Sequence, residues 1–371
     1  MDRAAEPSLP GGTFLTRGHA AALSAIERAV ASEHPPHALL LVGPRGVGKT
    51  TLALDLAAGL LCLLDDPAAR PCRDCSACRK VAADNHADLH LVEPEGAGEQ
   101  IRIGQVQALT SELSLTAMEG RFRIAVITAA HRLNLDAQNA LLKTLEEPGP
   151  RTCLILCADD AAPLLPTVLS RSARLRLAPM AIEALTDLLV AGGHVQPAQA
   201  RALAIAAGGR PGLATRLSTQ PEAVIARARI SRPLLELMPA DRRTRLGVAA
   251  DLITDGAVVD ASLRGEVAPS GTKLQPVERR RAVTLVIDVW RDLGRDLAVA
   301  AQGGGRGVRD LDQLEELLDL GGRVDATTLR RFLDRLDRLT LAIEGYASPE
   351  LTLDTLLLTW PRLAAAARSA A

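Results

Sequence analysis

The hydrophobic pattern separates a first part of the chain, where short apolar runs alternate with amphipathic segments, from a second part that is amphipathic throughout. In the first part, apolar runs predict strands at residues 37–42, 89–92, 100–103, 123–128 and 152–157. Apolar residues spaced three and four positions apart predict helices at residues 18–32, 48–61, 105–115 and 135–147. Strands that alternate with helices in this way indicate an α/β fold, in which a parallel sheet lies between two layers of helices.

The pattern changes near residue 178. From residue 179 onward the periodicity is almost entirely helical, with breaks at paired glycines such as Gly192-Gly193 and Gly208-Gly209. We therefore expect three domains: an α/β domain at residues 1–178 that contains an insertion at 62–88, a small helical domain at 179–220, and a larger helical domain at 221–371.

The composition is that of an ordinary globular protein. Hydrophobic residues make up 47% of the 371 residues and charged residues 23%, which excludes a wholly disordered or collagen-like chain. The net charge of −1 gives no general attraction to nucleic acid, and an aromatic content of 2% nearly excludes a stacking platform for single strands.

The chain shows no signal for export or membrane insertion. Its first residues, MDRAAEPSLPGG, lack the apolar core of a secretory signal. Acidic residues such as Asp55, Asp159 and Asp354 interrupt the apolar runs before they reach the ~18 residues of a membrane helix. We expect a cytoplasmic protein with no membrane partner.

A phosphate-binding loop lies between the first predicted strand and the helix that follows it. Its sequence fits G-x-x-x-x-G-K-[ST], and the strand–loop–helix context is the one that this motif requires. The glycines let backbone N–H groups surround phosphate oxygens, the lysine reaches the β and γ phosphates, and the threonine hydroxyl is a Mg²⁺ ligand. The predicted nucleotide-binding residues are Gly43, Pro44, Arg45, Gly46, Val47, Gly48, Lys49, Thr50 and Thr51.

The carboxylates that hydrolysis requires are missing from their usual position. A P-loop ATPase needs an acid for the Mg²⁺ shell and another to orient water, both at the end of the strand after the P-loop helix. Here Thr128 and Ala129 stand at that position, and His131 is a poor substitute for a hard-metal carboxylate. We expect nucleotide to be bound without hydrolysis; the alternative is an acid donated from elsewhere, by Asp159 or Asp160.

Four cysteines in the insertion have the spacing C-x9-C-x2-C-x2-C. Four thiolates can close a tetrahedral shell around a structural Zn²⁺ ion. The predicted ligands are Cys62, Cys72, Cys75 and Cys78. An iron–sulfur cluster is the alternative, and His86 and His90 are alternative ligands that we interpret instead as surface or hydrogen-bonded side chains. Cys153 and Cys157 alternate within an apolar strand and are expected to be buried as small hydrophobic residues.

Arg171 follows a short helical segment after the last predicted strand. An arginine at a domain edge can reach the γ-phosphate of a neighbouring subunit and stabilise charge in the transition state. Without further information, a solvated arginine or an internal salt bridge is the simpler interpretation, and the same holds for Arg174 and Arg176.

These segments together resemble the clamp-loader subunits of bacterial DNA polymerase III, which are members of the AAA+ superfamily. The resemblance covers about the first half of the chain and includes the four-cysteine insertion. The resembling strings are GPRGVGKTTLA (Gly43–Ala53), HADLH (His86–His90), LDAQNALLKTLEEP (Leu135–Pro148) and LPTVLSRS (Leu165–Ser172). The resemblance implies an AAA+ P-loop domain with a zinc module, followed by a helical lid domain and a helical collar domain that joins subunits.

The resemblance also implies a role. Ser170-Arg171-Ser172 corresponds to the family's Ser-Arg-Cys motif, whose arginine enters the ATP site of an adjacent motor subunit. Members like this chain are stators that do not hydrolyse ATP by themselves. The implied partners are gamma/tau-like motor subunits and the delta subunit in a five-member ring, the sliding clamp, and primed DNA; the implied cofactors are structural Zn²⁺ and ATP or ADP with Mg²⁺, held without hydrolysis.

Two further positions are compared with motor subunits of this family, and one expectation concerns DNA. The polar sensor of motor subunits falls near Ala158, which is apolar, and their second-domain arginine falls one position from Arg210. Phosphate contacts with DNA are expected near Lys143 or Arg102. Two other functions stay open: an ATP-hydrolysing motor subunit of the same loader, and an unrelated P-loop enzyme such as a nucleotide kinase.

Overall fold

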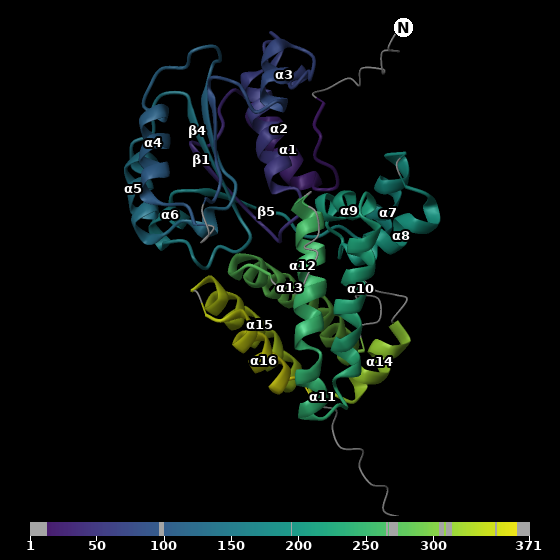
Figure 1. Ribbon diagram of the computed structural model, residues 1–371. Helices are drawn as coiled ribbons and strands as arrows, with labels where there is room; N and C mark the ends of the chain where they lie inside the picture. Colours follow the sequence, from purple (N-terminus) through teal and green to yellow (C-terminus); the bar gives the residue numbers. More distant parts are fainter. Residues whose placement is uncertain are drawn as a thin grey trace, which may run out of the picture. The chain divides into compact units, whose positions relative to one another are not determined.

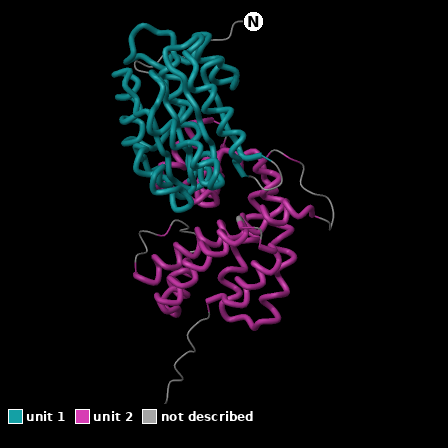
Figure 2. The backbone as a smooth tube through the Cα atoms, turned by 90° about the vertical axis from the view of Figure 1, so that its left-hand side faces the viewer, with its two compact units in different colours: residues 1–180, 210–212 teal, residues 181–209, 213–371 magenta. Residues whose placement is uncertain are grey.

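The chain forms two compact units, one of residues 1–180 with 210–212 and the other of residues 181–209 with 213–371 (Figure 2). The computed structural model describes residues 13–95, 100–193, 195–264, 266, 274–303, 308, 314–345 and 347–361. The first twelve residues, on which the absence of a secretory signal was predicted, lie outside this set.

The first unit is built on a five-stranded sheet in the order β2-β3-β4-β1-β5. Every neighbouring pair of strands in this sheet is parallel. This confirms the predicted parallel α/β sheet. The strands are β1 (Ala38–Val42), β2 (Leu89–Val92), β3 (Arg123–Ile127), β4 (Thr152–Ala158) and β5 (Ala173–Arg176).

Helices cover both faces of the sheet, with α1 and α2 on one side and α4, α5 and α6 on the other (Figure 1). The helical elements of this unit are α1 (Ala20–Ala31), α2 (Lys49–Leu61), η1 (Pro67–Ala69), α3 (Ser76–Ala82), α4 (Ile103–Leu113), η2 (Ala130–Arg132), α5 (Leu135–Glu146) and α6 (Pro166–Ser170). The predicted helix start at Asn134 is confirmed, because its side chain accepts the N–H of Ala137 at 2.9 Å.

Strands β1, β2, β3 and β4 each contribute to two hydrophobic cores because successive side chains point to opposite faces. On β1, Leu39 and Leu41 pack with the helices α1 and α2, whereas Leu40 packs on the opposite face. Cys153 and Cys157 on β4 belong to the first of these cores and are fully buried. Their predicted role as small hydrophobic residues is therefore confirmed.

Two local predictions differ from the structure. Residues 100–103 form no strand: Gln100 and Ile101 make isolated bridges, and α4 already begins at Ile103. The reason is a helix cap, because the Gln105 side chain accepts the N–H of Arg102 at 3.1 Å. Strand β5 was not predicted, because it is a four-residue edge strand without an apolar run.

The second unit is helical, as predicted. The remaining helices are α7 (Ile182–Ala191), α8 (Pro197–Ala206), α9 (Pro211–Ser218), α10 (Pro221–Glu236), α11 (Arg242–Gly247), α12 (Ala249–Arg264), α13 (Pro276–Ala301), α14 (Leu314–Gly322), α15 (Ala326–Glu344) and α16 (Pro349–Leu358). Trp290 and Trp360 meet in their core with ring centroids 4.4 Å apart, and Phe332 lies 4.6 Å from Trp360. The boundaries at 178 and 220 between three domains stay predictions.

None of the helices in the described part of the chain is long and apolar enough to cross a membrane.

Candidate functional site

The backbone of the phosphate loop forms a cradle at the start of α2. Gly46 and Gly48 have positive φ angles of 81° and 110°, a region that glycine enters without strain. Gly48 is the N-cap of α2 and provides no side-chain cap, so the first N–H groups of the helix point toward the loop without an acceptor from their own helix. These N–H groups can donate hydrogen bonds to an anion, and a phosphate ligand requires such donors.

The neighbours of the loop hold its shape. The Gly43 N–H donates to the carbonyl of Ala158 at 3.1 Å, which ties the loop to the end of β4. Val47 is fully buried, and its carbonyl accepts a hydrogen bond from His19 Nε2 at 2.9 Å. The N–H of Gly212 donates to the carbonyl of Gly46 at 2.9 Å, so the segment 210–212 also lies on the loop. Arg210 is buried in this segment.

Lys49 is folded back into the loop. Its ammonium nitrogen lies 2.6 Å from the carbonyl oxygen of Gly43, 3.1 Å from that of Pro44 and 2.7 Å from Oδ1 of Asp159. The side chain is only 7% exposed. The lysine that would meet a phosphate is therefore paired with a carboxylate from the end of β4.

Asp159 is held in place by His131. The Asp159 N–H donates to His131 Nδ1 at 3.2 Å, so the other ring nitrogen carries the proton and faces Asp159 Oδ2 at 3.6 Å. Burial lowers the pKa of His131 to about 4, which keeps the ring neutral. Burial opposes ionisation of Asp159, but the neighbouring Lys49 and His131 hold the pKa of this carboxyl below its usual range.

The end of β3 carries no acid. Thr128 directs its hydroxyl to the carbonyl of Val92 at 3.3 Å, and Ala129 begins the turn that carries His131. Of the two acids considered as substitutes, Asp159 contacts the loop, whereas Asp160 is exposed and accepts the N–H of Ala162 at 3.1 Å. Ala158, at the predicted sensor position, is buried and apolar.

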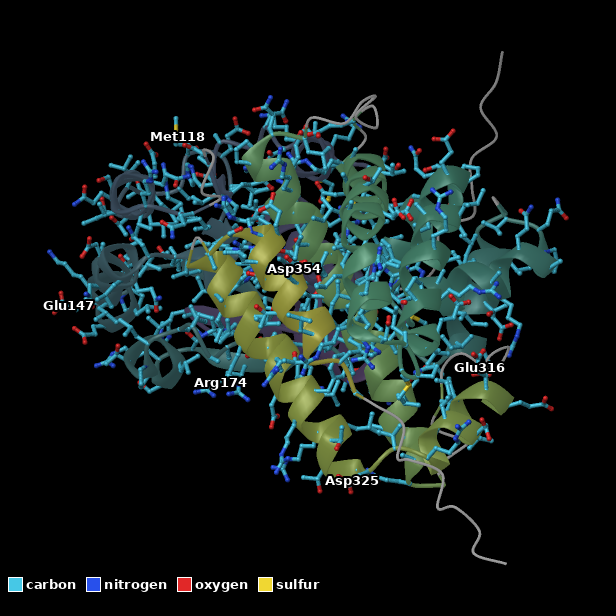
Figure 3. All side chains as sticks on the ribbon, turned by 60° about the horizontal axis from the view of Figure 1, so that its bottom comes forward. Met118, Glu147, Arg174, Glu316, Asp325 and Asp354 are labelled. Atoms are coloured by element: carbon cyan, nitrogen blue, oxygen red, sulfur yellow. The ribbon has the colours of Figure 1, made fainter. Side chains whose placement is uncertain are left out.

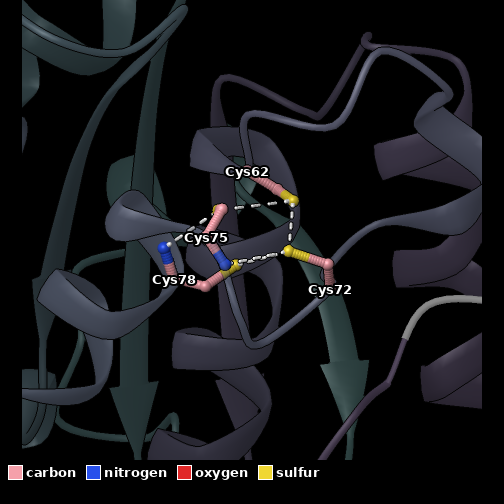
Figure 4. A group of neighbouring side chains, drawn as sticks. All are labelled: Cys62, Cys72, Cys75 and Cys78. Carbon is pink, nitrogen blue, oxygen red and sulfur yellow. Dashed lines mark hydrogen bonds between the residues drawn. The ribbon is translucent and has the colours of Figure 1, made fainter. Parts of the chain in front are cut away.

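The four cysteines of the insertion converge (Figure 4). Cys62 lies at the end of α2, Cys75 caps α3, and all four sulfurs lie within 4.8 Å of one another. The Sγ of Cys62 is 3.6 Å from that of Cys72 and 4.0 Å from that of Cys75, and Cys72 and Cys78 are 3.9 Å apart. These four thiols could hold one metal ion.

Hydrogen bonds prepare the sulfurs for a cation. The N–H of Cys75 donates to Cys72 Sγ at 3.3 Å, and the N–H of Cys78 donates to Cys75 Sγ at 3.4 Å. The hydrogen bond between Cys62 and Cys78 lowers the pKa of the Cys62 thiol to about 4 and raises the pKa of the Cys78 thiol, so the contact favours a thiolate at Cys62 and a proton on Cys78. Such contacts stabilise thiolates, which are the form that binds metal.

The two histidines near the insertion lie outside the cysteine group. His86 Nδ1 accepts the N–H of Asp88 at 3.1 Å, and His90 Nε2 lies 3.2 Å from the guanidinium of Arg123. Their interpretation as hydrogen-bonded side chains is therefore confirmed.

Arg171 lies at the end of α6, on the surface of the first unit. Its guanidinium is 2.8 Å from Oε1 of Glu146 on α5, and the two side chains are 36% and 51% exposed. It also donates to the carbonyl of Thr167 at 3.3 Å. Arg174, on β5, is exposed as well (Figure 3). The exposed residues Lys143 and Arg102 are likewise placed where they could meet a partner, and DNA contact there stays a prediction.

The ion pair between Lys49 and Asp159 is the part of the site that the sequence did not predict. The two residues are 110 positions apart, and they meet only because β4 lies beside β1. A pattern of strands and helices does not give the strand order. The only signal was an acid just after an apolar strand, which was read as a substitute metal ligand.

Comparison with known proteins finds a family that residues 18–181 resemble. The sequence model of the family described as "DNA polymerase III, delta subunit" matches residues 18–181. The subunit delta′ of DNA polymerase III from Bacillus subtilis is 39% identical over 168 residues, which cover 45% of this chain and 50% of that protein. The delta′ subunit from Pseudomonas aeruginosa is 39% identical over 185 residues, or 50% of this chain and 56% of that protein.

A related subunit also matches. The tau subunit of DNA polymerase III from Escherichia coli is 35% identical over 147 residues, which cover 40% of this chain and 22% of that protein. The chain spans about half the length of the delta′ relatives that it matches. The matched part is the unit that carries the phosphate loop, the four cysteines and Arg171. Residues 18–181 of this chain are therefore similar to the DNA polymerase III family described as "delta subunit", and the delta′ subunits are among the relatives that they match.

Proposed function

We propose that this chain is a subunit of the DNA polymerase III clamp loader that binds nucleotide without hydrolysing it and acts on a neighbouring subunit. The observation that carries this proposal is the end of β3, where Thr128 and Ala129 replace the acids that would hold Mg²⁺ and orient water. The phosphate loop beside it retains its glycines and Lys49. This site therefore has the residues for nucleotide binding without the acids for hydrolysis.

The nucleotide would be held by the loop and not transformed. Gly46 and Gly48 leave room for phosphate oxygens, the first turn of α2 offers N–H groups, and Thr50 offers a hydroxyl to Mg²⁺. The N–H groups of this cradle would complement the negative charge of a bound nucleotide. The nucleotide would stabilise the α/β domain in the conformation that contacts the neighbouring subunits.

Arg171 is the residue that we assign to the neighbour's reaction. Its side chain is partly exposed and that of its partner Glu146 is more exposed, so their ion pair contributes about 0–1 kcal/mol and is easily exchanged. A guanidinium at the end of the rigid helix α6 could therefore turn from Glu146 to the γ-phosphate of an adjacent motor subunit. Ser172, where the family has cysteine, is buried and donates to the carbonyl of Val168 at 2.9 Å, so it has an internal role.

The cysteine group fits a structural zinc ion. Four sulfurs that lie about 2.3 Å from zinc in a tetrahedron are about 3.8 Å from one another. The measured separations of 3.6, 3.9 and 4.0 Å agree with this value. A multi-iron cluster needs more widely spaced sulfurs, because several atoms lie between its ligands. We therefore assign Zn²⁺ to Cys62, Cys72, Cys75 and Cys78.

The proposed partners are those that the resemblance to clamp-loader subunits implies. The chain would join gamma/tau-like motor subunits and the delta subunit in a five-member ring, through its helical unit, and the ring would place a sliding clamp on primed DNA. The match to delta′ subunits disfavours an unrelated nucleotide kinase.

The second candidate is an ATP-hydrolysing motor subunit. The intact phosphate loop and the similarity to a tau subunit favour it. The acid that it requires would have to be Asp159, which in this structure contacts Lys49. A carboxylate beside the lysine would meet the terminal phosphate, where negative charge is unfavourable, so we prefer the non-hydrolysing role.

The proposed role of Arg171 is tested by Arg171→Ala in a reconstituted loader. We expect the ring to assemble and its ATP hydrolysis to fall at least about tenfold at the neighbouring site, because the transition-state charge loses a cation. Steady-state ATPase and size-exclusion chromatography measure the two effects.

Arg174→Ala is the matched control, since Arg174 is an exposed arginine three residues away that binds only the carbonyl of Leu169 at 2.9 and 3.2 Å among the described residues. It should leave the ATPase unchanged. Equal ATPase in the Arg171 variant and the unaltered loader would contradict the proposal.

A further inference from the structure

The ammonium group of Lys49 has no donor left for a phosphate. A lysine ammonium offers three N–H bonds, and here they point to two loop carbonyls and to Oδ1 of Asp159. The carboxylate is thus placed where the phosphate oxygens of a nucleotide would approach the lysine.

The surroundings of Asp159 orient its carboxylate toward Lys49, although the side chain is 38% exposed. Its backbone N–H is bound to His131 Nδ1, and its second oxygen faces His131 Nε2 at 3.6 Å. The preceding residue, Ala158, is fixed by β4 and by its hydrogen bond with Gly43. The backbone of Asp159 is therefore fixed beside the loop, in a position from which its carboxylate reaches Lys49.

A diphosphate and a triphosphate make different demands on this pair. The β-phosphate of a diphosphate needs one N–H of Lys49. This N–H can leave a loop carbonyl and turn to the phosphate, while another N–H of Lys49 stays bonded to Asp159. A triphosphate needs two, for the β and γ oxygens, and it also brings a doubly charged group close to the carboxylate. The negative charge of Asp159 therefore weakens the binding of a triphosphate more than that of a diphosphate.

We propose that Asp159 makes this loop select nucleoside diphosphates over nucleoside triphosphates, by holding Lys49 and repelling the γ-phosphate. The inference rests on the proposed binding of nucleotide without hydrolysis, and it names the ligand class. In such a subunit the diphosphate would stay bound while the neighbouring subunits bind and hydrolyse ATP.

Binding of mant-ADP and mant-ATP to the full chain tests the proposal. Fluorescence titrations with Mg²⁺ should show that the unaltered chain binds ADP at least about tenfold more tightly than ATP. The change Asp159→Asn keeps the shape of the side chain and removes its charge, so it should raise the affinity for ATP about tenfold and largely abolish the preference.

Asp160→Asn is the matched control, because Asp160 is the adjacent acid, is exposed and binds only the N–H of Ala162 among the described residues. It should keep the preference for ADP. Equal affinities for ADP and ATP in the unaltered chain would overturn the proposal even if the Asp159 variant failed to fold.

Two further outcomes would also overturn the preference for diphosphates. They distinguish a failure of this preference from a failure of the proposed nucleotide binding. If Asp159→Asn weakened the binding of ATP only when Mg²⁺ is present, Asp159 would be a metal ligand and nucleotide binding would stand. If neither nucleotide bound to either protein, the proposed nucleotide-binding role would fail as well.

Discussion

His131 is a buried histidine that contributes to stability only while it is neutral. It lies behind Asp159 at the ends of β3 and β4, where its ring accepts a backbone N–H. Burial lowers its pKa to about 4, whereas an unfolded histidine has a pKa of 6.5. The unfolded chain therefore binds more protons between these two values, so the first unit loses stability as the pH falls through this range.

We expect the free energy of unfolding of the first unit to fall by about 2 kcal/mol from pH 7 to pH 5 through His131 alone. Burial also lowers the pKa values of His86 and His90, so these histidines add to the effect in the same direction. Asp159, whose pKa lies below its usual range, stays ionised in this window. Hydrogen exchange of the amides of β3 and β4 is the appropriate measurement, because both tryptophans lie in the other unit.

The change His131→Gln should flatten this pH dependence, and His34→Gln, at an exposed histidine of the same unit, should not. The quantity to compare is the free energy of opening, obtained from the exchange rates after correction for the pH dependence of the intrinsic rate. An equal fall of this free energy from pH 7 to pH 5 in the His131 variant and the unaltered chain would show that His131 is not the group involved.

At the scale of elements, the cysteine module holds the N-terminal segment of the first unit against α2. Arg73, next to Cys72, donates to the carbonyl of Thr13 at 2.8 Å and forms an ion pair with the buried Asp55 of α2. Asp55 in turn accepts the N–H groups of Leu15 at 3.0 Å and Thr16 at 2.7 Å. A metal that fixes the cysteines therefore also fixes this segment.

We expect one Zn²⁺ ion per chain, lost when Cys72 and Cys75 are both replaced by serine, because two thiolates cannot close a tetrahedral shell. Elemental analysis measures the metal. The amides of Leu15 and Thr16 should then exchange at least about tenfold faster, since their acceptor Asp55 loses the support of Arg73.

His90→Gln is the control for an alternative ligand, and it should retain the zinc. A folded chain without zinc, or a cysteine double variant that keeps it, would refute the assignment. If the cysteine double variant showed faster amide exchange elsewhere but none at Leu15 and Thr16, the proposed support of the N-terminal segment by the cysteine module would be wrong.

The elements themselves were largely predictable, for physical reasons. The runs that became β1, β3 and β4 are apolar apart from Arg123 and Thr152 at their first positions, because both faces of a parallel sheet are covered by helices. The cap at Asn134 and the spacing of the cysteines are local signals, and the structure agrees with both. Strand β5 was missed because Ala173–Arg176 is half polar and pairs only at the edge of the sheet.

At the scale of the whole molecule, the first unit carries every site proposed here: the phosphate loop, the cysteine group and Arg171. The second unit is held by an apolar core that includes Trp290, and by the fully buried Arg245, whose guanidinium donates to the carbonyls of Met238, Ala240 and Trp360. Its helical character followed from periodicity. The bonds of Arg245 to Trp360 and of Trp290 to the carbonyl of Ile230 did not, because they join residues that are 115 and 60 positions apart.

The central claim is that this chain does not hydrolyse ATP and acts through a neighbour. The most direct measurement is the ATPase of a reconstituted loader in which the motor subunits carry inactive phosphate loops and this chain alone is unaltered. We expect no turnover above background, because Thr128 and Ala129 provide no acid. Steady turnover in that complex, abolished by Lys49→Ala in this chain, would contradict the account.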